Sequence, residues 1–304
     1  MTRKAVAPQF GATWRRAARA LRAADLYFGH GAASAEDEAA WMLIHALGWP
    51  VMESFAAFGS LAQRPVPADA MARFNDLIGQ RIASRKPVAY LLGEAWLQGV
   101  RFKVDERVIV PRSFIAELLP EALEPWLEAE PRRVADICTG SGCLGILAAL
   151  RWPQAHVICT DISADALDVA KANLSLHHLS DRVQLLRSDL LDALPSPQSG
   201  EGIDLLLCNP PYVNALAMRT LPREYQYEPA LALAGGSDGM DLIRRLLADA
   251  PRVLAPFGLV VVEIGHERAH FEAAFPRLPV IWLPTSAGDD KVLLVHAAAL
   301  REAA

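Results

Sequence analysis

Hydrophobic residues change their spacing near residue 90 of the chain. Before that point, apolar side chains recur every three or four positions, which is the spacing of one face of an α-helix. Such runs cover Trp14–Leu21, Trp41–Leu47 and Met71–Ile82, and prolines fall between them. Because proline interrupts helices rather than continuing them, the runs indicate separate helices. Residues 1–88 are therefore predicted to form a small helical domain.

Beyond residue 88 the spacing of apolar residues falls toward two, which is typical of β-strands. Val100, Phe102 and Val104 alternate with polar residues, and valines recur at positions 108 and 110. Asp105 and Glu106 stand between the two runs as a candidate turn. Residues 89–112 are therefore predicted to be a β-hairpin linker.

Residues 113–304 alternate β-rich runs with helical ones. The β-rich runs are Val134–Ile137, Val157–Thr160, Val183–Arg187, Ile203–Cys208 and Leu259–Ile264. Strands and helices in alternation are typical of a parallel sheet covered on both faces, so the predicted fold class is α/β. Two late β-rich runs around a turn-rich stretch would add an antiparallel edge: Pro279–Leu283 and Val292–His296.

Composition limits the class of protein. The 304 residues carry 35 Asp and Glu against 30 Lys and Arg, a net charge of −5, which argues against general affinity for a nucleic-acid backbone. No apolar run approaches the ~18 residues of a membrane span, and the N-terminus lacks the apolar core of a secretory signal. The four cysteines lie in apolar runs without CxxC spacing, as buried thiols of a reducing compartment do. We expect a cytoplasmic location.

Charge is uneven at the N-terminus. Six basic residues and no acidic one lie between Met1 and Arg22. This pattern fits the solvated face of a first helix, a contact for RNA or, because it is rich in arginine and free of acids, a transit peptide.

A glycine-rich turn follows the first predicted strand of the sheet. The run from Asp136 to Gly145 contains GxGxxG and leads into an apolar helix. Glycines allow a sharp turn and a close approach of ligand to backbone. Asp161 ends the next strand 21 residues after Gly140, near the spacing at which an acidic residue meets a ribose. The pattern predicts a cofactor that contains a nucleoside.

Two further carboxylates favour S-adenosyl-L-methionine over NAD as that cofactor. Asp136 stands where it could receive the ammonium of a methionine moiety, whereas a pyrophosphate-binding turn gains nothing from a carboxylate. Asp189, followed by Leu190, closes the third strand, where it could accept an adenine amino hydrogen. An NAD-dependent dehydrogenase stays open as the alternative that GxGxxG also allows.

The tetrad Asn209-Pro210-Pro211-Tyr212 directly follows the fourth predicted strand. Ligands of open parallel sheets gather beyond the carboxyl ends of strands. The two prolines stiffen the turn and remove two backbone donors, which leaves the Asn209 side-chain oxygen and the Pro210 carbonyl as preset acceptors. Such a pair would hold both hydrogens of a planar –NH₂ group while Tyr212 stacks on it. The tetrad is predicted to position an amide or aromatic amine for methyl transfer without a metal.

Together these motifs resemble the glutamine-specific protein methyltransferases, which methylate a glutamine amide in release factors or in a ribosomal protein. The resemblance covers nearly the whole chain and includes Tyr227-Glu228-Pro229 and the glycine-rich run at 235–239. Cys138, Pro111-Arg112-Ser113 and the run at 27–31 are similar to the branch that acts on large-subunit ribosomal protein L-three. That protein is the expected substrate, with a release factor as the alternative.

The resemblance implies a Rossmann-like S-adenosylmethionine-dependent methyltransferase domain over residues 113–304, with a mostly parallel seven-stranded sheet. It also implies that the helical domain recognises the protein substrate. The tetrad would hold the glutamine, and the cofactor would be surrounded by Asp136, Thr139, Gly140, Ser141, Gly142, Cys143, Asp161, Asp189, Leu190 and Asn209. Three residues match family positions without a role that the sequence explains: Arg112, Glu117 and Glu228.

Two other functions stay open. His266-Glu267-Arg268-Ala269-His270 matches HExxH, which on a helix supplies two zinc ligands and a general base. The sequence offers no convincing third ligand, so we predict no metal. Asn-Pro-Pro-Tyr is also shared with enzymes that methylate amino groups of nucleic-acid bases, although we expect no nucleic-acid substrate and no membrane partner.

Overall fold

A computed structural model describes residues 7–196 and 202–303 and divides into two compact units. Unit 1 comprises the chain up to Ala95 together with Pro222–Tyr227, and unit 2 comprises Trp96–Leu221 and Glu228–Ala304. The basic residues at positions 3 and 4 lie outside the described residues. Within the described part, no helix is long and apolar enough to cross a membrane.

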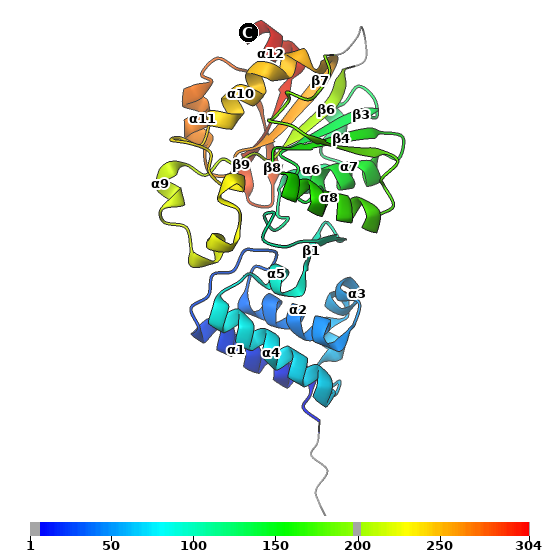
Figure 1. The fold of residues 1–304 in the computed structure, drawn as a ribbon, viewed down its shortest axis with the longest axis vertical. Coiled ribbons are helices and arrows are strands. Elements are labelled where there is room, and N and C mark those ends of the chain that lie inside the picture. The colour runs from blue at the N-terminus through cyan, green and yellow to red at the C-terminus, as the bar shows by residue number, and fades with distance from the viewer. Residues whose placement is uncertain (1–6, 197–201, 304) are drawn as a thin grey trace, which may run out of the picture. The chain divides into compact units, whose positions relative to one another are not determined.

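Unit 1 is helical, as the three-to-four spacing predicts (Figure 1). Its helices are α1 (Phe10–Ala23), α2 (Ala35–Leu47), α3 (Val51–Ala56), α4 (Ala68–Ser84) and α5 (Val88–Leu92). Helix α2 packs against both α1 and α4 and is buried along most of its length. Ser34 caps its N-terminus by accepting a hydrogen bond from the Asp37 amide, and Gly48 ends it with a φ of 66°.

The inner face of α4 is not the purely apolar stripe that its sequence predicts. Leu77 and Ile78 are only half-buried, whereas the Arg81 side chain is fully buried. Arg81 donates to both carboxylate oxygens of Glu38, at 2.8 and 3.0 Å. This two-point pairing compensates the guanidinium for lost water. Burial raises the pKa of Glu38, and the Arg81 partner opposes that rise.

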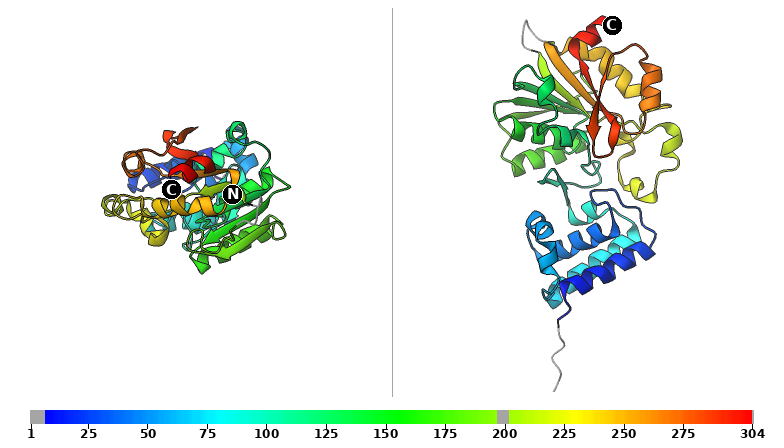
Figure 2. Two further views of the ribbon diagram at one scale, coloured as in Figure 1. Left: turned by 90° about the horizontal axis from the view of Figure 1, so that it is seen from above. Right: turned by 180° about the vertical axis from the view of Figure 1, so that it is seen from behind.

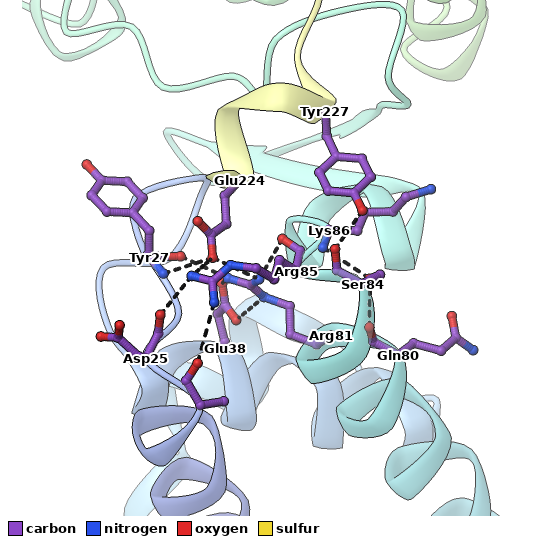
Figure 3. Close-up of polar contacts among 11 residues, drawn as sticks. Asp25, Tyr27, Glu38, Gln80, Arg81, Ser84, Arg85, Lys86, Glu224 and Tyr227 are labelled. Carbon is purple, nitrogen blue, oxygen red and sulfur yellow. Dashed lines mark hydrogen bonds and ion pairs between the residues drawn. The ribbon is translucent and has the colours of Figure 1, made fainter. Parts of the chain in front are cut away.

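A second carboxylate reaches the same cluster from a distant part of the sequence (Figure 3). Glu224, on the 3-10 turn Arg223–Tyr227, is fully buried and accepts from Arg85 at 2.7 Å and from the Tyr27 amide at 3.0 Å. Tyr227 donates to the Ser84 carbonyl at 2.6 Å. The cluster therefore balances two arginines with two glutamates inside unit 1.

The hairpin exists, but its turn is not where the sequence predicts it. Strands β1 (Glu94–Leu97) and β2 (Val100–Lys103) pair around Gln98 and Gly99, whose φ values are 49° and 74°. Two successive positive φ values are typical of the tight turns that match strand twist. A turn does follow at Asp105, where the Val108 amide donates to the Asp105 carbonyl at 3.2 Å and the Arg107 amide donates to the Asp105 carboxylate. This turn leads into no second strand, so the prediction of a strand at 108–110 is wrong.

Unit 2 contains the seven-stranded sheet, so the predicted fold class is confirmed. Its strands are β3 (Arg133–Ile137), β4 (His156–Asp161), β5 (Val183–Arg187), β6 (Ile203–Cys208), β7 (Leu254–Glu263), β8 (Ile281–Thr285) and β9 (Gly288–His296), in the order β5-β4-β3-β6-β7-β9-β8. All pairs are parallel except β7–β9 and β8–β9. Those two late strands form the predicted antiparallel edge, drawn in red in the rear view of Figure 2.

Helices cover both faces of the sheet (Figure 1). One face packs against α6 (Ile115–Leu118), α7 (Cys143–Arg151) and α8 (Ala164–Leu176), and the other against α10 (Asp241–Asp249), α11 (Arg268–Ala274) and α12 (Ala297–Ala303). Alternate strand residues such as Leu206, Val260 and Leu293 form the core on the second face. A short helix, α9 (Ala215–Met218), follows the tetrad. Burial on both faces explains why these strands are almost entirely apolar.

Candidate functional site

The carboxyl ends of β3, β4 and β6 meet at one edge of the sheet, where the predicted motifs lie. A pocket of about 200 Å³ opens there, and its lining includes Gly140, Asp161, Asp189, Leu190 and Asn209. A narrower pocket of about 30 Å³ shares Cys138, Gly140 and Asn209 with it, and it is also lined by Asp136, Thr139, Ser141 and Cys143. Of the ten residues predicted to surround the cofactor, only Gly142 lies outside both linings.

The glycine turn is held by backbone geometry and one carboxylate. Gly140 and Gly142 have φ values of 55° and 81°, in the left-handed region that favours glycine. The Gly140 amide donates to Asp161 at 2.9 Å, which ties the turn after β3 to the end of β4. Gly145 packs so closely on the sheet that a Cβ there would lie 2.2 Å from the Cys159 sulfur. The third glycine thus serves helix–sheet packing.

Asp136 is a buried carboxylate that lines the narrower pocket. Its Oδ2 accepts from the Thr139 hydroxyl and, at 2.8 Å, from the Gly145 amide. Burial raises the pKa of Asp136 to about 7, against the opposing effect of these two hydrogen bonds. Because both bonds use Oδ2, Oδ1 is the oxygen left for a ligand. A buried acid with such a raised pKa in a pocket is typical of a functional site.

The other two carboxylates predicted to bind the cofactor, Asp161 and Asp189, differ in their surroundings. Asp161 accepts from the Ser163 amide at 2.9 Å as well as from Gly140, and burial raises the pKa of its carboxyl group. Asp189 instead pairs with Arg245 at 2.9 Å, with both side chains partly exposed. The lining of this pocket also includes Leu231, which is 60% exposed. Exposed apolar and polar groups thus meet at the mouth of the larger pocket.

Three glycines pack directly around the Asn-Pro-Pro-Tyr turn. A Cβ at Gly235 would lie 2.6 Å from the Tyr212 Cα, one at Gly239 2.3 Å from the Tyr212 carbonyl oxygen, and one at Gly265 2.4 Å from the Tyr212 ring. The turn is therefore held by contacts that only glycine permits. This packing explains the glycine-rich run at 235–239 that the sequence shows without a stated role.

Members of the tetrad face different surroundings. Asn209 lines both pockets and Pro211 lines the larger one, whereas Pro210 and Tyr212 line neither. The Tyr212 hydroxyl donates to Glu263 at 3.2 Å. Glu263 is buried, and it also accepts hydrogen bonds from the Ser113 hydroxyl and the Phe114 amide. Burial raises the pKa of Glu263, whereas these hydrogen bonds oppose that rise. Sequence reasoning missed Glu263 because a single acid in an apolar strand carries no motif.

Within unit 2, ion pairs or hydrogen bonds engage the three residues to which the sequence assigns no role: Arg112, Glu117 and Glu228. Arg112 pairs through both terminal nitrogens with Glu228, and Glu228 also accepts from the Val110 amide at 3.1 Å. This pairing holds the loop that contributes Ile109 to both pockets. Glu117 accepts from the amide and hydroxyl of Ser286. Their roles here are to anchor loops.

The HExxH pattern does not form a zinc-binding helix. Helix α11 begins at Arg268, so His266 precedes it and the two histidines do not share a helical face. His266 meets the Lys291 ammonium at 2.7 Å, and His270 pairs with Glu267. Across residues 7–196 and 202–303, no group of three metal-binding side chains is found.

Comparisons with known proteins agree with this architecture. A model of the methyltransferase small domain matches residues 115–223, and a model of the PrmC N-terminal domain matches residues 13–93. The ribosomal protein uL3 glutamine methyltransferase of Bordetella pertussis is 50% identical over 285 residues, which is 92% of each chain. The chain belongs to the ribosomal protein uL3 glutamine methyltransferase family. The resemblance predicted from the motifs, including the ribosomal-protein branch, is thereby confirmed.

Other relatives extend the same picture. The enzyme of that name from Burkholderia pseudomallei is 48% identical and covers 94% of both chains. Among solved structures, the hMettl16 catalytic domain in complex with a MAT2A 3'UTR hairpin has a TM-score of 0.50, 14% identity, and coverage of 72% of this chain and 80% of its own. At that identity the likeness concerns the fold alone.

Proposed function

We propose that this chain transfers the methyl group of S-adenosyl-L-methionine to the side-chain amide nitrogen of a glutamine in ribosomal protein uL3. The observation that carries the proposal is the place of Asn209, which lines both pockets beside the buried Asp136. Relatives up to 50% identical over more than nine-tenths of the chain carry the name of this activity. Expected partners and location follow: a ribosomal protein, in the cytoplasm.

The donor set fits an S-adenosyl-L-methionine molecule. Asp136 would hold the ammonium through Oδ1, because an ionised carboxylate in a buried setting pairs strongly with a cation. Asp161 would accept from the ribose hydroxyls, and the apolar mouth near Leu231 would cover the adenine with Asp189 and Leu190 at its edge. When bound, the cofactor supplies a sulfonium-activated methyl carbon.

The tetrad would activate the amide by orientation. An amide nitrogen is a poor nucleophile because its lone pair is delocalised, with a C–N rotation barrier of ~18–20 kcal/mol. The Asn209 side-chain oxygen and the Pro210 carbonyl would accept both N–H bonds and so turn the lone pair toward the methyl carbon. The glycines around Tyr212 and its hydrogen bond to Glu263 keep the turn rigid, which limits the entropy lost in transfer. The helical residues 1–88 would dock the protein substrate.

One labelling experiment tests the function. Purified enzyme is incubated with tritiated S-adenosyl-L-methionine and, separately, with uL3, a release factor and total RNA. We expect label in uL3 alone, on a glutamine identified by mass spectrometry, and its loss in Asn209→Ala. Label in release factor or RNA instead would refute the substrate. A reaction that requires zinc or NADH would refute the mechanism.

A further inference from the structure

The outer face of α1 carries a row of arginines within unit 1. Arg15, Arg19 and Arg22 are separated by four and three positions, so they lie on one side of the helix, with Arg16 beside them. All four side chains are exposed, and the opposite side of α1 is buried through Phe10, Ala17, Ala18 and Leu21. The helix therefore cannot turn its apolar side toward a membrane without leaving the bundle.

Nearby acidic side chains neutralise only part of the positive charge of this arginine row. Arg22 pairs with Glu36, and Arg16 contacts the Met71 sulfur at 4.0 Å. Within the described part of the chain, neither Arg15 nor Arg19 has an ion-pair partner. Helix α1 contains no acidic residue at all. At least two guanidinium groups are thus free to bind an anion.

Charge is also divided between the units. Unit 1 carries 12 Lys and Arg against 9 Asp and Glu, whereas unit 2 carries 18 against 26. An acidic unit 2 repels polyanions, so a polyanion would favour unit 1, which carries the arginine row. Every basic residue of that row is an arginine, whose planar fork binds phosphate through two hydrogen bonds. A backbone of regularly spaced phosphates offers such a row more partners than isolated carboxylates on a folded protein do.

We propose that the arginine row of α1 binds the RNA phosphate backbone, so that the enzyme meets its protein substrate on RNA of an assembling ribosomal particle. The proposal rests on the function proposed above for the identity of the particle, but the RNA contact itself does not depend on methyl transfer. RNA here is a docking partner and not the methyl acceptor.

The test measures binding of a fluorescein-labelled single-stranded RNA of mixed sequence to the full-length protein, by anisotropy over a range of salt concentrations. The variant is Arg15→Gln/Arg19→Gln. The matched control is Arg219→Gln/Arg277→Gln, which removes the same charge from exposed positions of unit 2. We expect the variant to bind roughly fivefold more weakly or worse and its log–log salt slope to fall by about 1.4, because each single-strand phosphate contact contributes about 0.7. The control should bind as the unaltered protein does.

Two outcomes overturn the proposal. One is an unchanged affinity and salt slope in the α1 variant, whose folding is verified by its thermal unfolding and by S-adenosylhomocysteine binding. The other is a loss of methylation of isolated, RNA-free uL3 in that variant, because the row would then contact the protein substrate. Absence of methylation in the unaltered enzyme would instead refute the proposed function and leave the RNA measurement intact.

Discussion

Replacing Asp136 by asparagine should stabilise the ligand-free protein while impairing cofactor binding. Asparagine keeps an oxygen that can accept from Thr139 and Gly145, so the local hydrogen bonds survive. The change removes only the ability to ionise. In the folded chain, burial raises the pKa of Asp136 from 3.8 to about 7.

That shift defines both the size and the pH window of the effect. The unfolded carboxyl ionises near pH 4, but the folded one resists ionisation up to about pH 7, so the native state loses stability as pH rises between these values. Three pKa units correspond to about 4 kcal/mol, which is an upper bound. The variant lacks this cost of burying an ionised carboxylate. Its stability advantage should therefore be smallest below about pH 4, reach roughly a third of its full value at pH 5, and be complete near pH 8.

Urea unfolding of the ligand-free proteins at pH 5 and pH 8 measures this difference directly. Asp192→Asn is the matched control, because it makes the same carboxylate-to-amide change at an exposed position. S-adenosylhomocysteine binding to Asp136→Asn at pH 8 should weaken by tenfold or more, since the ammonium then meets an amide. A stability difference that is the same at both pH values, or that favours the unaltered protein at pH 8, would falsify the claim that ionising the buried Asp136 destabilises the folded protein.

The remaining predictions address the turn, the sheet and unit 1. Asn209→Ala should slow methyl transfer by about 10²-fold in single-turnover assays while changing the cofactor dissociation constant little, because orientation of the amide is lost; equal turnover would contradict its role. Gly145→Ala should lower the free energy of unfolding by about 1–3 kcal/mol, since its Cβ would meet the Cys159 sulfur, and adding Cys159→Ala should restore it if that contact is the cause. Arg81→Met should lower it by about 3–5 kcal/mol, because Glu38 would remain buried without its cation and Glu224 would keep only Arg85; a loss below 1 kcal/mol would show that water replaces the guanidinium.

Sequence by itself determined the elements and the motifs. The change from helical to alternating spacing located a helical unit before a strand-rich one, because each regular structure exposes and buries residues at its own period. The positions of Asp136, Asp161 and Asn209 at strand ends also followed from the sequence, since parallel strands bring their carboxyl ends to one edge. For that reason most of the predicted cofactor residues line the two pockets.

Only the tertiary structure decided which polar groups are buried together. Nothing in the local pattern distinguishes Arg81 from an exposed arginine, because its partners Glu38 and Glu224 lie 43 and 143 positions away. Likewise the bonds of Tyr212 to Glu263 and of Arg112 to Glu228 join distant segments. Periodicity reports how one segment meets its surroundings, whereas the pairing of charges depends on which segments the fold brings into contact.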